Sequence, residues 1–260
     1  MASTVDILLR SYYKDFGWLS FCLRSIAKYC HGFRDVVVVV PEDSRERLRL
    51  AEATPAHVQY CPQFPDDYLG QQVTKLYADT YTDADFIIHV DSDCIFRRAC
   101  SPLDLCKGER PHLLVTSCSQ FPGRAPWQVA TERFLRSRIS YDFMRRQPLM
   151  YPRWIYGELR QYARNLHKRE LADYVMDQPP LGFSEFNALG AFAYSFYRSA
   201  FHWVETDEIA FNEQFCRIFW SWEGLHEGHQ YEIESILGLK TALGPSSGEC
   251  AREEESRPCE

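Results

Sequence analysis

The sequence predicts an α/β protein with a mostly parallel sheet flanked by helices. Two features of residues 4–120 carry this prediction: short apolar runs alternate with helical segments, and several of the runs show no polar alternation. Strands that are buried on both faces give such continuous runs, which are typical of parallel sheets covered by helices. Strands and helices that alternate along the chain build right-handed β-α-β units.

Each expected element of this half follows from its own residues. Apolar and β-branched side chains mark the expected strands, which span residues 5–10, 35–40, 57–60, 85–90 and 111–117. Residues 17–30 and 69–81 carry apolar side chains three and four positions apart, so we expect a helix with one buried face in each. Residues 42–53 form a polar run, which we expect to be a surface helix.

The second half begins with a segment of different composition. Residues 121–180 are rich in Arg, Tyr, Trp and Pro, and apolar residues recur at helical spacing from Trp154 to Leu166, which predicts a helical insertion on the sheet. The elements expected after it are a helix at 183–201, a strand at 216–222 and a helix at 229–239. We therefore expect a single domain over residues 1–243. The acidic tail, residues 244–260, lacks large apolar side chains and is expected to be disordered.

Composition limits the class of protein. The chain has 260 residues, 45% of them hydrophobic, which is enough for one sizeable core. No apolar run approaches the roughly 20 residues of a membrane span, and the start shows no signal-peptide pattern, so we expect a cytoplasmic protein. None of the 10 cysteines forms a C-x-x-C pair, which favours reduced thiols over disulfides or a zinc ribbon.

The net charge of −7 is unevenly distributed. Residues 124–170 hold 11 Lys and Arg against 4 Asp and Glu, a net charge of +7, whereas the remaining 18 basic and 32 acidic residues give −14. The basic segment either contacts a polyanion or is an ordinary solvated helix surface.

An acidic pair ends the expected strand at residues 85–90. Asp91 and Asp93 lie at its carboxyl end, where ligands collect in parallel α/β sheets. Alternation along an extended chain points both side chains the same way, and two like charges held close favour a cation beside them. Oxygen ligands suit Mg²⁺ or Mn²⁺ that carries a substrate diphosphate. Taken alone, the pair also fits a polar strand end whose carboxylates cap neighbouring turns.

Four segments together resemble one known family. They read VDILLRSYYKDFGWLSFCLRSI, LGQQVTKL, HVDSDCIF and FSEFNALGAF. They are similar to GT-A glycosyltransferases, specifically to a glycosyltransferase-like family catalogued as a domain of unknown function, over most of residues 4–240. The resemblance implies a Rossmann-like GT-A fold and a metal-dependent transfer of sugar from a nucleotide-sugar, with a UDP-sugar as the first expectation, to a hydroxyl acceptor.

The resemblance also implies roles for particular residues. Asp93 would be the direct ligand of Mn²⁺ or Mg²⁺, and Asp91 would lie near the ribose or the metal. Positions 71 and 75 share a helix face and could reach the donor together, although a solvated face is the ordinary alternative. The residues expected to bind the donor are Arg10, Ser11, Tyr12, Gln71, Lys75, Asp91 and Ser92.

Three further positions have both a chemical and a structural interpretation. Ser184 is a good N-cap, and Glu185 follows it in a first turn, where the helix dipole favours a carboxylate that can accept a proton from an acceptor hydroxyl. Asn187 would bind sugar hydroxyls. Each could instead be a plain helix-start residue.

Two histidines follow the last expected strand. The resemblance implies that His226 or His229 is a further metal ligand. The run HEGH is not H-E-x-x-H, so we reject a zinc protease.

The acceptor and two rival functions stay open. Arg145, Arg146 and Trp154 are the expected acceptor-binding residues, since basic groups among rings suit a phosphate-bearing acceptor. A glycan or other small hydroxyl compound ranks first, and hydroxymethylated DNA or an anionic lipid head group comes after it. The rivals are a phosphotransferase of the haloacid dehalogenase type, with the first Asp as nucleophile, and a binding domain without catalysis.

Overall fold

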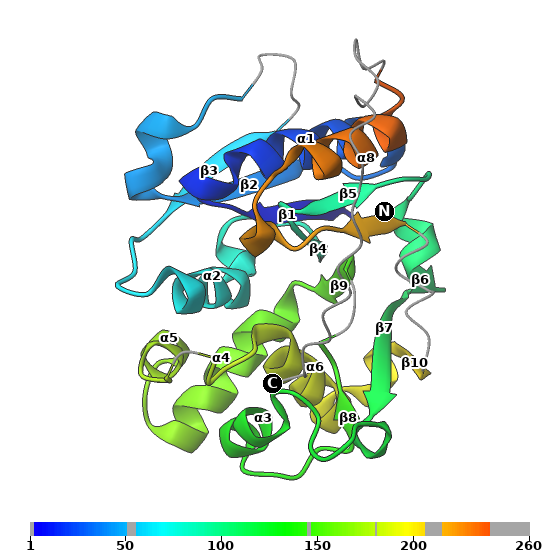
Figure 1. The fold of residues 1–260 in the computed structure, drawn as a ribbon. Helices are drawn as coiled ribbons and strands as arrows, with labels where there is room; N and C mark the ends of the chain where they lie inside the picture. The colour runs from blue at the N-terminus through cyan, green and yellow to red at the C-terminus, as the bar shows by residue number, and fades with distance from the viewer. Residues whose placement is uncertain (1–2, 51–55, 145–146, 180, 206–214, 240–260) are drawn as a thin grey trace.

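The computed structural model describes residues 3–50, 56–144, 147–179, 181–205 and 215–239. These residues show the predicted α/β architecture, a mixed and mostly parallel central sheet flanked by helices (Figure 1). The sheet has the strand order β3, β2, β1, β4, β9. Its strands are β1 (Val5–Arg10), β2 (Val36–Pro41), β3 (His57–Cys61), β4 (Phe86–Asp91) and β9 (Leu149–Pro152). The first four are parallel, and β9 runs antiparallel to β4.

Helices cover both faces of this sheet, as the unbroken apolar runs require. Ile7 and Leu9 pack into one hydrophobic cluster with the buried face of α1 (Phe16–Tyr29), whereas Leu8 packs into the cluster on the opposite face. Two helices, α1 and α8 (Glu227–Leu237), lie over the first face (Figure 1). The helices over the other face are α2 (Asp67–Leu76), α4 (Trp154–His167), α5 (Leu171–Met176) and α6 (Glu185–Phe196), with α3 (Gln128–Leu135) against α6.

Smaller sheets and turns complete the described fold. The strands outside the central sheet are β5 (Cys94–Phe96), which pairs with β11 (Cys216–Ile218), and β7 (Arg110–Ser117), which pairs with β6 (Cys106–Lys107), β8 (Tyr141–Asp142) and β10 (His202–Glu205). The 3₁₀ turns are η1 (Tyr13–Asp15), η2 (Glu42–Arg47), η3 (Ala78–Thr80), η4 (Pro102–Leu105), η5 (Cys118–Gln120), η6 (Arg198–Ala200) and η7 (Ser221–Glu223).

Several elements differ from the sequence prediction, among them the expected strand at 216–222, which is a strand only over Cys216–Ile218. The run at 111–117 is a strand, but the place beside β4 is taken by β9, so β7 pairs elsewhere. The segment 121–180 has the predicted helices and also contributes β9, whose four residues are too few to show a periodicity; Pro152 is tolerated because β9 is an edge strand. The polar run at 42–53 was expected to be a helix; its described part forms the 3₁₀ turn η2 over Glu42–Arg47, after which Leu48 and Leu50 pack on the core, and residues 51–53 lie outside the described residues.

Two predictions on cysteines and membrane spans can be compared with the described residues. The eight cysteines within them are all free thiols, as expected. No described helix combines the length and the apolar character needed to cross a bilayer. The tail at 244–260 lies outside the described residues.

Candidate functional site

Several residues of the predicted site lie at the carboxyl edge of the central sheet, where its parallel strands end. Because β1 and β4 are parallel neighbours in register, Arg10 lies opposite Asp91 at the end of both strands. The side chain of Asp91 is held by two groups. Lys75 Nζ lies 2.7 Å from its Oδ1, and the Gln147 amide donates to its Oδ2 and accepts from its backbone N–H. Asp91 therefore has a fixed orientation at this edge.

Lys75 links two carboxylates that are far apart in sequence. Its Nζ lies 3.0 Å from Glu185 Oε1, and both side chains are buried. Burial lowers the pKa of Lys75, but the ion pairs with Asp91 and Glu185 outweigh it, so the pKa is raised and the lysine stays a cation. Gln72 accepts a hydrogen bond from the Glu185 backbone N–H at 3.1 Å, which fixes α2 against the start of α6.

Asp93 has a different environment. Its Oδ2 accepts from the Ser221 backbone N–H at 3.0 Å, and no ion pair joins it to a basic side chain in the described part of the chain. Loss of solvation, together with the nearby charge of Asp91, raises the pKa of Asp93 to about 7. A carboxylate so placed is costly to ionise unless a cation comes close.

A second carboxyl at this edge also has a raised pKa. Burial raises the pKa of Asp15 to about 6, the charges of Asp67 and Asp91 add to this, and Arg10 opposes it. Arg10 itself is buried and makes a two-bonded ion pair with Asp67. Among the described residues of this edge, Arg10 and Lys75 are thus already paired with carboxylates, and Lys14 lowers the pKa of Asp15 only slightly.

The acidic pair opens on a cavity. The cavity has a volume of about 230 Å³, and its walls are Asp91, Asp93, Cys94, Met144, Gln147, Ile218 and Trp220. Trp220 stacks on Trp222, with ring centroids 4.7 Å apart and planes at 16°. Both rings are solvent-exposed, at 47% and 76%. An aromatic platform therefore stands beside the two carboxylates.

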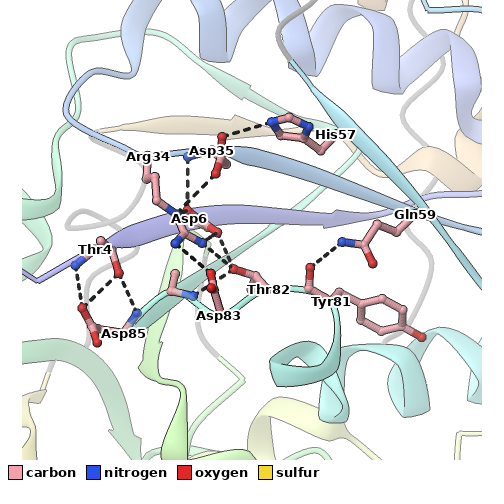
Figure 2. A network of polar contacts seen from close by, with 11 residues as sticks. Thr4, Asp6, Arg34, Asp35, His57, Gln59, Tyr81, Thr82, Asp83 and Asp85 are labelled. Carbon is pink, nitrogen blue, oxygen red and sulfur yellow. Dashed lines mark hydrogen bonds and ion pairs between the residues drawn. The ribbon is translucent and has the colours of Figure 1, made fainter.

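The opposite edge of the sheet provides a contrast. A hollow of about 470 Å³ there is also lined by acidic residues, among them Asp6. Figure 2 shows how the charge of Asp6 is satisfied: Asp6 accepts from Arg34 at 2.6 and 2.9 Å, from the Asp35 backbone N–H at 3.1 Å and from Thr82. This network holds strands and turns together and leaves no comparable demand for a cation.

The residues expected to bind the nucleotide-sugar donor lie in different surroundings. Ser11 and Ser92 are buried near the ends of β1 and β4, and the hydroxyl of Ser11 has no hydrogen-bond partner among the described residues. The Arg10 guanidinium lies 6.0 Å from the Tyr12 ring centroid. Gln71 is half-buried on α2, and it is its neighbour Gln72 that contacts Glu185.

Other predicted residues lie elsewhere or in structural roles. Ser184 is the N-cap of α6, as predicted, and accepts from the backbone N–H of Asn187. The side chain of buried Asn187 accepts from the Phe143 backbone N–H at 2.7 Å, so it anchors the chain. Trp154 lies beyond the far end of β9 and packs on Tyr197, so the structure does not bring it to the acidic pair.

The remaining predicted residues are the two histidines and two arginines. His226 and His229 come together with Glu223, and no contact joins either to Asp91 or Asp93 within the described ranges. Arg145 and Arg146 lie outside the described residues.

Sequence reasoning missed several members of this site. Gln147 is 56 positions from Asp91 and carries no motif, so only the pairing of β9 with β4 reveals it. Asp67 follows the N-cap Asp66 and looks like an ordinary helix-start acid. Asp15 could have been considered, since it closely follows the predicted donor residues at 10–12.

No family model matches the chain, and no curated protein matches it either.

Proposed function

We propose that this chain is a metal-dependent glycosyltransferase of the GT-A type, which moves a sugar from a nucleotide-sugar, with a UDP-sugar as first candidate, to a hydroxyl acceptor. One observation carries the proposal. Asp93 has a pKa raised to about 7, has no basic partner within the described residues and faces a cavity beside Asp91. The geometry thus supports a cation at the carboxyl edge of the sheet, where the sequence pattern predicts one.

The donor atoms present fit a hard divalent cation. Asp93 Oδ1 accepts no N–H or O–H hydrogen bond within the described chain, and each oxygen of Asp91 keeps a lone pair beyond its single partner. An all-oxygen set with open positions suits Mg²⁺ or Mn²⁺. When bound there, the cation would neutralise the charge that develops on the departing nucleoside diphosphate.

The surrounding residues hold this set in place. Lys75 and Gln147 fix the carboxylate of Asp91, and the Ser221 backbone N–H fixes Oδ2 of Asp93. The Trp220 and Trp222 platform offers a flat apolar face to a base or sugar ring at the mouth of the cavity. Hydrogen bonds and an ion pair would therefore orient the carboxylates, while the exposed tryptophans would provide the binding face.

The role of Glu185 as the base stays a proposal with a specific difficulty. Its carboxylate is buried and bound to Lys75, and it is not among the residues that line the cavity. An acceptor hydroxyl would have to reach it past Lys75. The same contact also allows a positioning role, in which Glu185 keeps the lysine against Asp91.

Nucleotide release tests the proposal directly. Purified full chain is incubated with Mn²⁺, a panel of UDP-, GDP- and CMP-sugars and a panel of glycan acceptors, and free nucleotide and transferred sugar are both measured. We expect one donor to be consumed, with activity lost in Asp93→Asn and retained in the control Asp83→Asn, because Asp83 is a highly exposed acid at the opposite edge.

Two results would contradict this function. Release of inorganic phosphate from phosphorylated substrates, without sugar transfer, would indicate the phosphotransferase. Binding of nucleotide-sugar without turnover on any acceptor, duplex DNA with hydroxymethylcytosine included, would indicate a binding domain.

A further inference from the structure

A separate group of metal-ligating side chains lies on the segment that follows β11. Glu223 ends η7, His226 is the N-cap of α8, and His229 lies in the first turn of that helix. Each offers one ligand atom, and the three atoms all lie within 4.8 Å of one another. No other trio of His, Cys, Asp or Glu in the described ranges has this property.

The ring of His229 is preorganised for metal binding. Its Nδ1 lies 3.0 Å from the Gly224 carbonyl oxygen, which can only accept, so Nδ1 carries the proton and Nε2 keeps its lone pair. An imidazole whose second nitrogen donates to a carbonyl is the usual arrangement of a metal-bound histidine. The ring also packs at 5.4 Å against both Trp18 and Phe219, and it is only 15% exposed.

The other two groups lie close to this ring, with one ligand atom of each within 4.8 Å of the others. The His226 ring stacks on His229, with centroids 3.6 Å apart and planes at 27°. Glu223 Oε2 lies 3.9 Å from His229 Nε2, too far for a good hydrogen bond and close enough for a shared ion. The Nδ1 of His226 accepts from the His229 backbone N–H at 3.3 Å, a long bond that metal binding can replace at little cost.

We propose that Glu223, His226 and His229 bind a divalent transition metal, with Zn²⁺ as the best fit, at a site distinct from the Asp91 and Asp93 pair. The two imidazoles are borderline ligands that favour Zn²⁺, which also accepts a carboxylate oxygen, whereas the acidic pair offers only hard oxygen ligands. Three protein ligands leave a fourth position for water, as is usual for zinc sites that are not purely structural.

Metal bound at this site would stabilise one wall of the cavity beside Asp91 and Asp93. Trp220 lines that cavity and Ser221 donates its backbone N–H to Asp93, and they lie three and two positions before the first ligand, Glu223. A metal that joins η7 to the start of α8 would therefore hold this wall in place. We expect Zn²⁺ to raise the melting temperature of the chain, since a ligand that binds only the folded state stabilises it.

Metal titration of the full chain tests the site without any glycosyl donor. The chain is stripped with a chelator and titrated with Zn²⁺ by calorimetry, and with Co²⁺ by visible absorption. We expect one equivalent of either metal to bind with tetrahedral Co²⁺ bands, and millimolar Mg²⁺ not to displace it. His226→Asn and Glu223→Gln should each lower the affinity at least tenfold, because Asn keeps the helix cap and Gln keeps the shape of the glutamate.

Two control variants distinguish zinc binding at this site from zinc binding by other side chains. His31→Asn alters an exposed histidine outside the group and should bind like the parent. The double variant Asp91→Asn, Asp93→Asn should keep the zinc equivalent, whether or not the chain proves to be a glycosyltransferase.

Several outcomes would overturn the proposal. These are a parent that binds no zinc, zinc binding that is unchanged in His226→Asn and Glu223→Gln, or zinc binding that is lost only in the double aspartate variant. The first would leave Glu223, His226 and His229 as polar side chains that cap the start of α8.

Discussion

The substitution Asp93→Asn should make the metal-free chain more stable, although it removes a proposed ligand. The pKa of Asp93 is about 7 in the folded chain, above its ordinary value of 3.8. Between these two values the folded state keeps a proton that the unfolded state has released. The free energy of unfolding of the parent therefore falls as the pH rises through this interval.

The size of the effect follows from the two values. The gap between 3.8 and about 7, at about 1.36 kcal/mol per pH unit, corresponds to about 4 kcal/mol. Asp93 is half-buried and touches solvent through the cavity, so we take about half of that figure, or ~2 kcal/mol at pH 8 and under ~1 kcal/mol at pH 5. Asparagine retains an oxygen that can accept from the Ser221 backbone N–H.

Urea unfolding followed by circular dichroism at pH 5 and pH 8 measures this gain. Adding Mn²⁺ should then stabilise the parent and leave Asp93→Asn unchanged, because a cation that binds only the folded parent offsets the cost of its charge. In the parent, the pKa of the exposed Asp83 is lowered by Arg34, so the control Asp83→Asn should show no gain at pH 8. A variant that is destabilised at both pH values, or a gain that does not depend on pH, would refute the reasoning.

Three further substitutions test the contacts around the site. Lys75→Met should destabilise the chain by about 3 kcal/mol in urea unfolding, because it leaves Asp91 and Glu185 close together with no cation between them. Glu185→Gln should lower turnover by about 100-fold with donor affinity unchanged if Glu185 is the base, as measured by kcat and calorimetry. Asp6→Asn should cost about 2 kcal/mol of stability, since Arg34 loses a buried charged partner, while Mn²⁺ binding stays at the parent value.

Each of these has a contrary outcome. Unchanged stability in Lys75→Met would show that the lysine does not neutralise the two carboxylates. A Glu185→Gln variant that loses donor affinity together with turnover would assign Glu185 to positioning of Lys75. Loss of Mn²⁺ binding in Asp6→Asn would mean that the polar network around Asp6 affects metal binding at Asp91 and Asp93.

Local residue patterns were sufficient to predict the buried strands of the central sheet and the start of one helix. The unbroken apolar runs of β1, β2 and β4 predicted strands buried on both faces, and the two clusters around Ile7 and Leu8 confirm it. The N-cap at Ser184 was predicted from a single local residue and is present. Local patterns were enough here because each element is decided by its own side chains and nearest turn.

Long-range contacts could not be predicted in the same way. The ion pair of Lys75 with Glu185 joins positions 110 apart, and Gln147 reaches Asp91 only because a four-residue strand pairs with β4. Such partners depend on which strand pairs with β4, and that strand is β9 and not β7. A local pattern carries no record of this long-range pairing.

The short strand β9 also makes the chain intolerant of length changes at one place. Met150 faces one hydrophobic cluster, while Leu149 and Tyr151 face the other. Deleting one residue from this strand would turn each side chain toward the opposite hydrophobic cluster. A shift of two residues in the register of β9 against β4 would move Gln147 about 7 Å along the strand, beyond reach of Asp91. The length of residues 147–152 therefore decides whether Gln147 reaches Asp91 at the end of β4. An insertion or deletion there would break this contact, although every other residue that contacts the acidic pair would still be present in the chain.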